Sequence, residues 1–215
     1  MPNRTNKAIL TPRRLSENDR FAAKTLLTVS LIAMSAAVIT VLVFYALHYW
    51  VTDLMSAIAY SFLAPPIFLL VVLCIELLLR LVSRFTGFLR GLFDRDRWFI
   101  RVNEPFGAVV GLFTFTKVIV GGDGDVYELI YNHEMTHYKG KDNIKVLTLI
   151  SLITAPAAFL VFSLNFLERP LFTYFNTFFN TLSTILFVSI GSFILMMLRA
   201  FEVHADYGAF RVMGP

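Results

Sequence analysis

Residues 25–50 read TLLTVSLIAMSAAVITVLVFYALHYW, a run without Asp, Glu, Lys or Arg. About 20 apolar residues in a helix cross a bilayer, so this run is long enough to span one. Three further runs meet the same requirement, at 54–79, 146–167 and 171–198, and none of them has Lys or Arg inside it. With 57% hydrophobic and 16% charged residues, the chain is too apolar for an ordinary soluble domain. The sequence therefore predicts a mainly α-helical integral membrane protein with four transmembrane helices.

The basic residues predict the orientation of these helices. Lys and Arg accumulate on the cytoplasmic side of a membrane because they resist translocation. Of the 19 Lys and Arg residues, Arg169 alone lies between the third and fourth runs, and the others fall in segments 1–24, 80–145 and 199–215. We expect these three segments, and both ends of the chain, to be cytoplasmic in a multi-pass protein of the cell membrane.

Other protein classes are excluded by what the sequence lacks. Cys74 is the only cysteine, so neither a disulfide framework nor a cysteine metal cluster is expected. The net charge of +4 comes from residues that flank the apolar runs, and no phosphate-binding glycine loop followed by Lys-Ser or Lys-Thr is present. We therefore expect no nucleic-acid partner. Within the second run, Glu76 stands four residues before Arg80, and this spacing predicts an ion pair on one helix face.

The segment 80–145 is the predicted location of the chemistry. Residues 100–120 are rich in β-branched and aromatic side chains interrupted by Gly111, a pattern that indicates a small β-ribbon. The turn sequence GGDG follows at 121–124, and a helix is expected from about 126 to 140. This helix carries the sequence HEMTH.

The HEMTH sequence predicts a zinc site. His133 and His137 are four residues apart, so both imidazoles project from one helix face and can bind a single Zn²⁺. In this pattern Glu134 acts as the general base toward the water that zinc activates. Because a catalytic zinc needs a third protein ligand and an open position, a further ligand must come from elsewhere in the chain. The sequence thus predicts a zinc metalloendopeptidase with one Zn²⁺ per chain.

Candidates for the third ligand follow the fourth run, where residues 199–206 read RAFEVHAD. Glu202 and Asp206 share a helix face, so Glu202 can bind the metal while Asp206 orients a ligating histidine. His204 points elsewhere and is the weaker alternative as ligand. His204 and Tyr131 are also candidate contacts to substrate or transition state, with interfacial packing as the competing interpretation.

The stretches HEMTHYKGKDN and FEVHAD resemble the HtpX-like membrane metallopeptidases, gluzincin-type relatives of the CAAX prenyl endoproteases. The resemblance implies the same order of spans, with His133, His137 and Glu202 as zinc ligands, Glu134 as base and Asp206 supporting a ligand. It also implies that the strand near 103–111 pairs with an extended substrate and that Asn103 contacts it. The sequence NEPFG at 103–107 matches the family's Asn-Ala-Phe element only loosely. The run PFGAVVGLFTFTKVIV resembles the related antirepressor peptidases of β-lactam sensors.

A zinc ion held by these residues would lie next to the cytoplasmic ends of the spans. We therefore expect cleavage of membrane proteins or membrane-associated polypeptides at the cytoplasmic face, as in protein quality control. Two alternatives stay open. One is a signalling peptidase of the antirepressor type, and the other is a non-catalytic membrane scaffold with a structural metal. The oligomeric state, the cleavage preference and the physiological substrate do not follow from the sequence.

Overall fold

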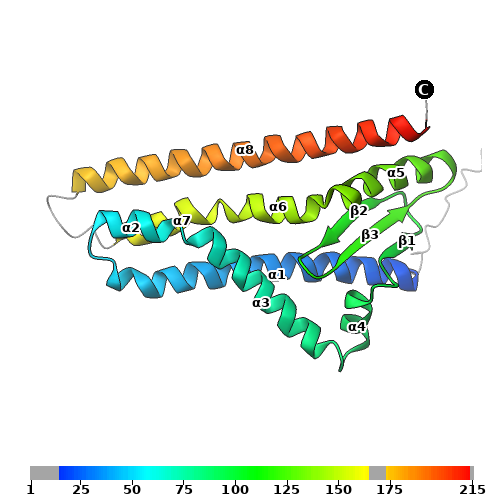
Figure 1. Ribbon diagram of the computed structural model, residues 1–215, viewed down its shortest axis with the longest axis horizontal. Coiled ribbons are helices and arrows are strands. Elements are labelled where there is room, and N and C mark those ends of the chain that lie inside the picture. The colour runs from blue at the N-terminus through cyan, green and yellow to red at the C-terminus, as the bar shows by residue number, and fades with distance from the viewer. Residues whose placement is uncertain (1–14, 165–172, 214–215) are drawn as a thin grey trace, which may run out of the picture.

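The computed structural model describes residues 15–164 and 173–213 (Figure 1). In chain order its elements are α1 (Glu17–Leu47), the 3₁₀ turn η1 (His48–Trp50), α2 (Leu54–Ser61), α3 (Ala64–Val82), α4 (Gly87–Phe93), β1 (Phe99–Val102), β2 (Gly107–Gly111), β3 (Thr116–Gly121), α5 (Gly124–Gly140), α6 (Asp142–Ser151), α7 (Thr154–Ser163) and α8 (Thr173–Met213). Arg169 and parts of four predicted segments, at 1–14, 165–167, 171–172 and 214–215, lie outside the described residues.

Four helical segments are long and apolar enough to cross a membrane, which confirms the number of predicted spans. They are Glu17–Trp50, Ala64–Val82, Asp142–Ser163 and Thr177–Val212. Figure 1 shows α1, the series α5–α6–α7 and α8 running along the long axis, with the sheet and α4 at the end where α1 begins and α8 ends. The mainly helical architecture with a small β element therefore agrees with the sequence.

All four spans have limits different from those predicted, and the second and fourth spans differ most. The run 54–79 is divided into α2 and α3, and only α3, with 19 residues, qualifies as a span. Pro65 and Pro66 explain the division, because proline has no backbone N–H to donate within a helix but fits the first turn of a new one. The described parts of the predicted fourth span and of the segment 199–215 form one continuous helix, the 41-residue α8. The carboxyl-terminal segment is therefore a rigid extension of the last span.

The β element is a three-stranded mixed sheet in the order β1-β3-β2. β2 and β3 form the antiparallel hairpin expected from the ribbon pattern, with Val109 opposite Val118. β1 adds to the other side of β3 in parallel, with Ile100 opposite Ile119. The central strand is fully buried at 118–120, whereas β2 lies at an edge of the sheet.

The predicted pair between Glu76 and Arg80 is wrong. Glu76 is fully buried and accepts hydrogen bonds from the backbone N–H of Phe113 at 3.0 Å and from the N–H and hydroxyl of Thr114, both at 2.6 Å. The N–H groups in the turn of the β2–β3 hairpin have no strand partner, so a buried carboxylate can satisfy them, while Arg80 stays exposed. Glu76 therefore attaches the hairpin to α3.

Candidate metal centre

The helix α5 presents both histidines of HEMTH on one face. It begins at Gly124, and both Gly124 and the nearby Gly122 have positive φ angles, of 55° and 115°, a conformation that glycine adopts without strain. It ends at Gly140, as predicted, because Lys141 takes a left-handed conformation with φ 54°. His133 and His137 lie one turn apart along this helix, with ring centroids 4.8 Å from each other.

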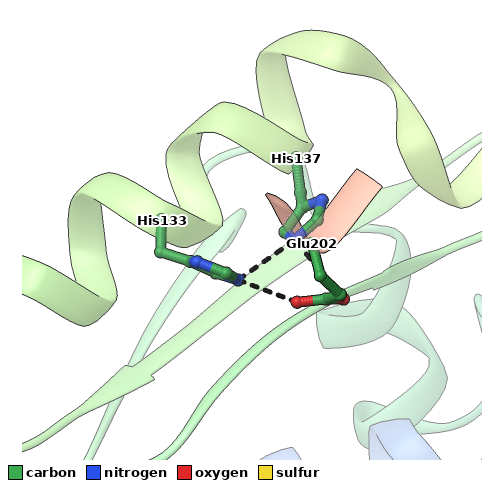
Figure 2. Close-up of side chains that lie close together, drawn as sticks. All are labelled: His133, His137 and Glu202. Carbon is green, nitrogen blue, oxygen red and sulfur yellow. Dashed lines mark hydrogen bonds and ion pairs between the residues drawn. The ribbon is translucent and has the colours of Figure 1, made fainter. Parts of the chain in front are cut away.

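Glu202 of α8 meets the two histidines, although it lies 65 positions after His137 in the sequence. Figure 2 shows the two imidazoles projecting from α5 toward the Glu202 carboxylate. The His133 Nε2 atom lies 3.1 Å from His137 Nε2 and 3.2 Å from Glu202 Oε2. The His137 Nε2 atom lies 3.6 Å from Glu202 Oε1. The structure thus brings together the three residues that the sequence predicted as ligands.

These separations fit a zinc-sized ion. Nitrogen and oxygen ligands lie about 2.0–2.2 Å from a tetrahedral zinc, which places neighbouring ligand atoms about 3.3 Å apart. The three observed separations, 3.1, 3.2 and 3.6 Å, lie on both sides of that value. One ion could therefore contact both Nε2 atoms and the carboxylate with only small side-chain shifts.

Both histidines are oriented by carboxylates on the ring nitrogen that faces away from the centre. The Nδ1 atom of His133 lies 2.9 Å from Asp206 Oδ1, and that of His137 lies 2.9 Å from Asp142 Oδ2. A carboxylate at Nδ1 keeps the proton on that nitrogen, so the Nε2 lone pair is available to a metal. Asp206 lies beside His133, where its predicted supporting role would require it, whereas sequence reasoning did not identify Asp142.

Asp142 is the more enclosed of the two carboxylates. Its side chain is 7% exposed, against 62% for Asp206. Its second oxygen accepts a hydrogen bond from the Lys145 ammonium at 2.8 Å. The left-handed turn at Lys141 brings Asp142 back to His137, and Gly140 leaves space for it, since a Cβ there would lie 2.8 Å from Asp142 Oδ1. The sequence signal for this contact was an acidic residue five positions after the second histidine, following a glycine that ends the helix.

The carboxylate of Glu134 is buried beside the edge strand. Glu134 is 7% exposed, and a Cβ added to Gly107 of β2 would lie only 2.4 Å from its Oε1 atom. Burial raises the pKa of Glu134 to about 7; the neighbouring His133 opposes this shift and Glu202 adds to it. A carboxyl group with a pKa near neutrality can both accept and return a proton.

Small residues let α8 approach α5 closely enough to place Glu202. Ala205 and Ala209 are fully buried in α8, and a Cβ added to Gly208 would lie 2.5 Å from the Thr136 hydroxyl of α5. These positions lie on the same helix as Glu202 and within two turns of it. Packing of the two helices therefore determines the distance between the carboxylate and the histidines.

A cleft of about 430 Å³ contains the three ligands and Glu134. All of β2 lines one side of it. Its apolar walls come from α1, α6 and α8 and include Val29, Ala33, Val146, Ile150, Leu198 and Phe201. The centre thus opens on one side to a sheet edge and on another to side chains of the apolar spans.

The other predicted site residues do not line this cleft. Asn103 donates from its backbone N–H and its amide to the two oxygens of Asp19, at 3.0 and 2.7 Å, which attaches the β1–β2 loop to α1. Tyr131 packs between Phe99 and Tyr127, with ring centroids 5.9 and 6.0 Å away. His204 is exposed on α8.

Comparison with known families agrees with this geometry. The sequence model of peptidase family M48 matches residues 116–215, a range that contains both histidines on α5 and Glu202 on α8. No curated protein and no solved structure matches the chain. The match covers the metal-binding helix and its partner helix together. Residues 116–215 are therefore similar to peptidase family M48, the family of the HtpX-like zinc metallopeptidases.

Proposed function

We propose that this chain is a membrane-embedded zinc endopeptidase that cleaves membrane proteins or membrane-associated polypeptides at the cytoplasmic face. One observation carries the proposal. Two histidines of α5 and Glu202 of α8 converge with ligand atoms 3.1–3.6 Å apart, beside a buried glutamate. This is the donor set of a catalytic zinc site, in which three protein ligands leave one position open.

The residues of the cleft have separate tasks in peptide hydrolysis. Zinc, when bound, would polarise the scissile carbonyl and make a water molecule easier to deprotonate. Glu134 accepts the proton of that water and later donates it to the amine of the leaving segment, for which a pKa near 7 is suitable. Asp206 and Asp142 keep the two imidazoles in their ligating orientation.

The edge strand β2 supplies a docking element for an extended polypeptide. Its five residues all line the cleft, and Gly107 lies against Glu134. An extended segment that adds to a sheet edge forms backbone hydrogen bonds independent of its sequence, and its scissile bond is then held at a fixed distance from the base. Substrates must therefore present an unfolded or flexible segment.

The position of the cleft favours substrates at the membrane. Its apolar wall includes Val29 and Ala33 of α1 and Ile150 of α6, all within the candidate spans. The Lys and Arg distribution favours a cytoplasmic location for this end of the molecule. A polypeptide that reaches the centre would thus do so beside the inner surface of the bilayer.

The proposal is tested by comparing Glu134→Gln with the parent protein on an unfolded polypeptide, with zinc measured in both. We expect Glu134→Gln to retain zinc and to lose cleavage activity by about 10²–10⁴-fold, because the general base is removed while the ligands remain. Glu202→Gln is the matched variant for the metal, and it should lose zinc together with activity. Equal cleavage by Glu134→Gln and the parent would refute the enzymatic role and favour a structural metal.

A further inference from the structure

A second cavity, of about 580 Å³, lies apart from the cleft of the metal centre and shares only Asn143 with it. Its walls come from the end of α4, the loop that leads to β1, the β2–β3 turn and the α5–α6 junction. None of the proposed catalytic residues or metal ligands lines it. The proposed peptidase chemistry therefore does not explain this cavity.

The lining of the second cavity is strongly cationic. It includes Arg95, Lys117, Lys139 and Lys141, against Asp94 as the single acidic lining residue. Within 15–164 and 173–213, none of the four cations forms an ion pair with a carboxylate. Such an excess of positive charge in a concave site attracts an anion.

Lys117 strengthens the argument because its ammonium group is enclosed. The residue is 1% exposed, and its Nζ donates to the backbone carbonyls of Asp94 at 2.5 Å and Arg97 at 2.7 Å. An ammonium group has three N–H donors, so one remains for a ligand. Burial lowers the pKa of Lys117 to about 8 and Arg97 adds to this shift, while Asp94 opposes it without supplying the full counter-charge that a buried ammonium group needs. A bound anion would supply that counter-charge.

The apolar part of the cavity lies at the level of the spans. Phe93 and Phe115 pack edge to face, with ring centroids 5.2 Å apart, in the cluster that includes Val72 of α3. The neighbouring Thr114 is bonded to Glu76 of the same span. Two of the cations, Lys139 and Lys141, immediately precede the span Asp142–Ser163. The cavity therefore combines phenylalanines beside a span with cations just outside one.

We propose that this cavity binds the phosphate-bearing headgroup of an anionic membrane lipid, with an acyl chain against the phenylalanines of α4 and the hairpin turn. Basic pockets between membrane helices at the cytoplasmic surface have the chemistry to bind such headgroups. The inference depends on the proposed membrane placement, but not on peptidase activity. A bound lipid would hold the turn of the hairpin that carries β2.

The test uses the full chain in nanodiscs of phosphatidylcholine with or without phosphatidylglycerol. Lipid retained after release into detergent is measured by native mass spectrometry. The variant combines Arg95→Gln with Lys141→Asn, both at exposed positions, and asparagine tolerates the left-handed backbone at 141. The control combines Arg80→Gln with Arg84→Gln, which removes the same charge from exposed positions that do not line the cavity.

We expect the parent and the control to retain phosphatidylglycerol in preference to phosphatidylcholine. The cavity variant should bind phosphatidylglycerol about 25-fold more weakly, since each of the two cations removed should account for about 5-fold. Equal losses in both double variants would overturn the proposal, because attraction would then come from the general surface charge. Competition by inorganic phosphate as effective as that of phosphatidylglycerol would also overturn it, since the ligand would be a soluble anion. Circular dichroism verifies that each variant is folded.

Discussion

Replacement of Asp142 by asparagine should weaken zinc binding more than the same change at Asp206. The two carboxylates contact their histidines at the same distance, 2.9 Å, but the side chain of Asp142 is 7% exposed and that of Asp206 is 62% exposed. Loss of a carboxylate that orients a ligating histidine weakens metal binding by about 10–100-fold. Water screens the exposed Asp206 carboxylate and can replace it as a partner of the histidine. We therefore expect zinc to bind about 100-fold more weakly to Asp142→Asn and about 10-fold more weakly to Asp206→Asn.

The measurement is a competition titration of the zinc-free protein with a chromogenic chelator. Lys145→Met is the matched control for Asp142, because it removes the ammonium bonded to this carboxylate and leaves the carboxylate in place. Its zinc affinity should stay close to that of the parent. A larger loss for Asp206→Asn than for Asp142→Asn, or no loss for Asp142→Asn, would refute the role inferred from burial and geometry.

Three further predictions concern the packing around the centre and the second cavity. Gly107→Ala should reduce cleavage while zinc is retained, because the added methyl group meets the Glu134 carboxylate at 2.4 Å; unchanged turnover would contradict this close contact. Gly208→Val should reduce both zinc content and cleavage, because the added side chain would separate α8 from α5. Adding Thr136→Ala to this variant should restore part of the zinc content and part of the cleavage. Metal analysis and peptidase assays measure the two effects. The pKa of Lys117 is about 8 in the folded protein and 10.5 in the unfolded chain. Between these pH values the unfolded state binds more protons than the folded state. The free energy of unfolding should therefore rise with pH over this range. Denaturant titrations in zwitterionic detergent should show this rise in the parent and not in Lys117→Met.

The residues proposed to bind the metal could be selected from the sequence because the spacing within each helix is local. In a helix, a spacing of four residues places His133 beside His137, and the same spacing places Glu202 beside Asp206. The pairing of these two helices did not follow from spacing, and it was inferred from a family resemblance. The structure accounts for it by the close approach of α8 to α5 at Gly208.

Other features depended on contacts between distant segments. Glu76 has a basic residue at the helical spacing, yet its partners are N–H groups 37 and 38 residues away, at a hairpin turn that the sequence does not place against α3. Asp142 reaches His137 only because Lys141 adopts a left-handed conformation that its residue type does not predict. The sequence shows Pro65 and Pro66 in the second run, but such prolines are equally compatible with a bend in one helix and with a division into two helices.

Zinc K-edge X-ray absorption of the zinc-loaded chain tests most directly whether α5 and α8 share one metal ion. Two imidazoles and at least one oxygen ligand, at about 2.0–2.2 Å, are expected for one zinc per chain. The oxygen contribution should change in Glu202→Gln, and one imidazole should be lost in His133→Ala. A parent spectrum without imidazole scattering, or one that neither substitution alters, would contradict the proposed centre.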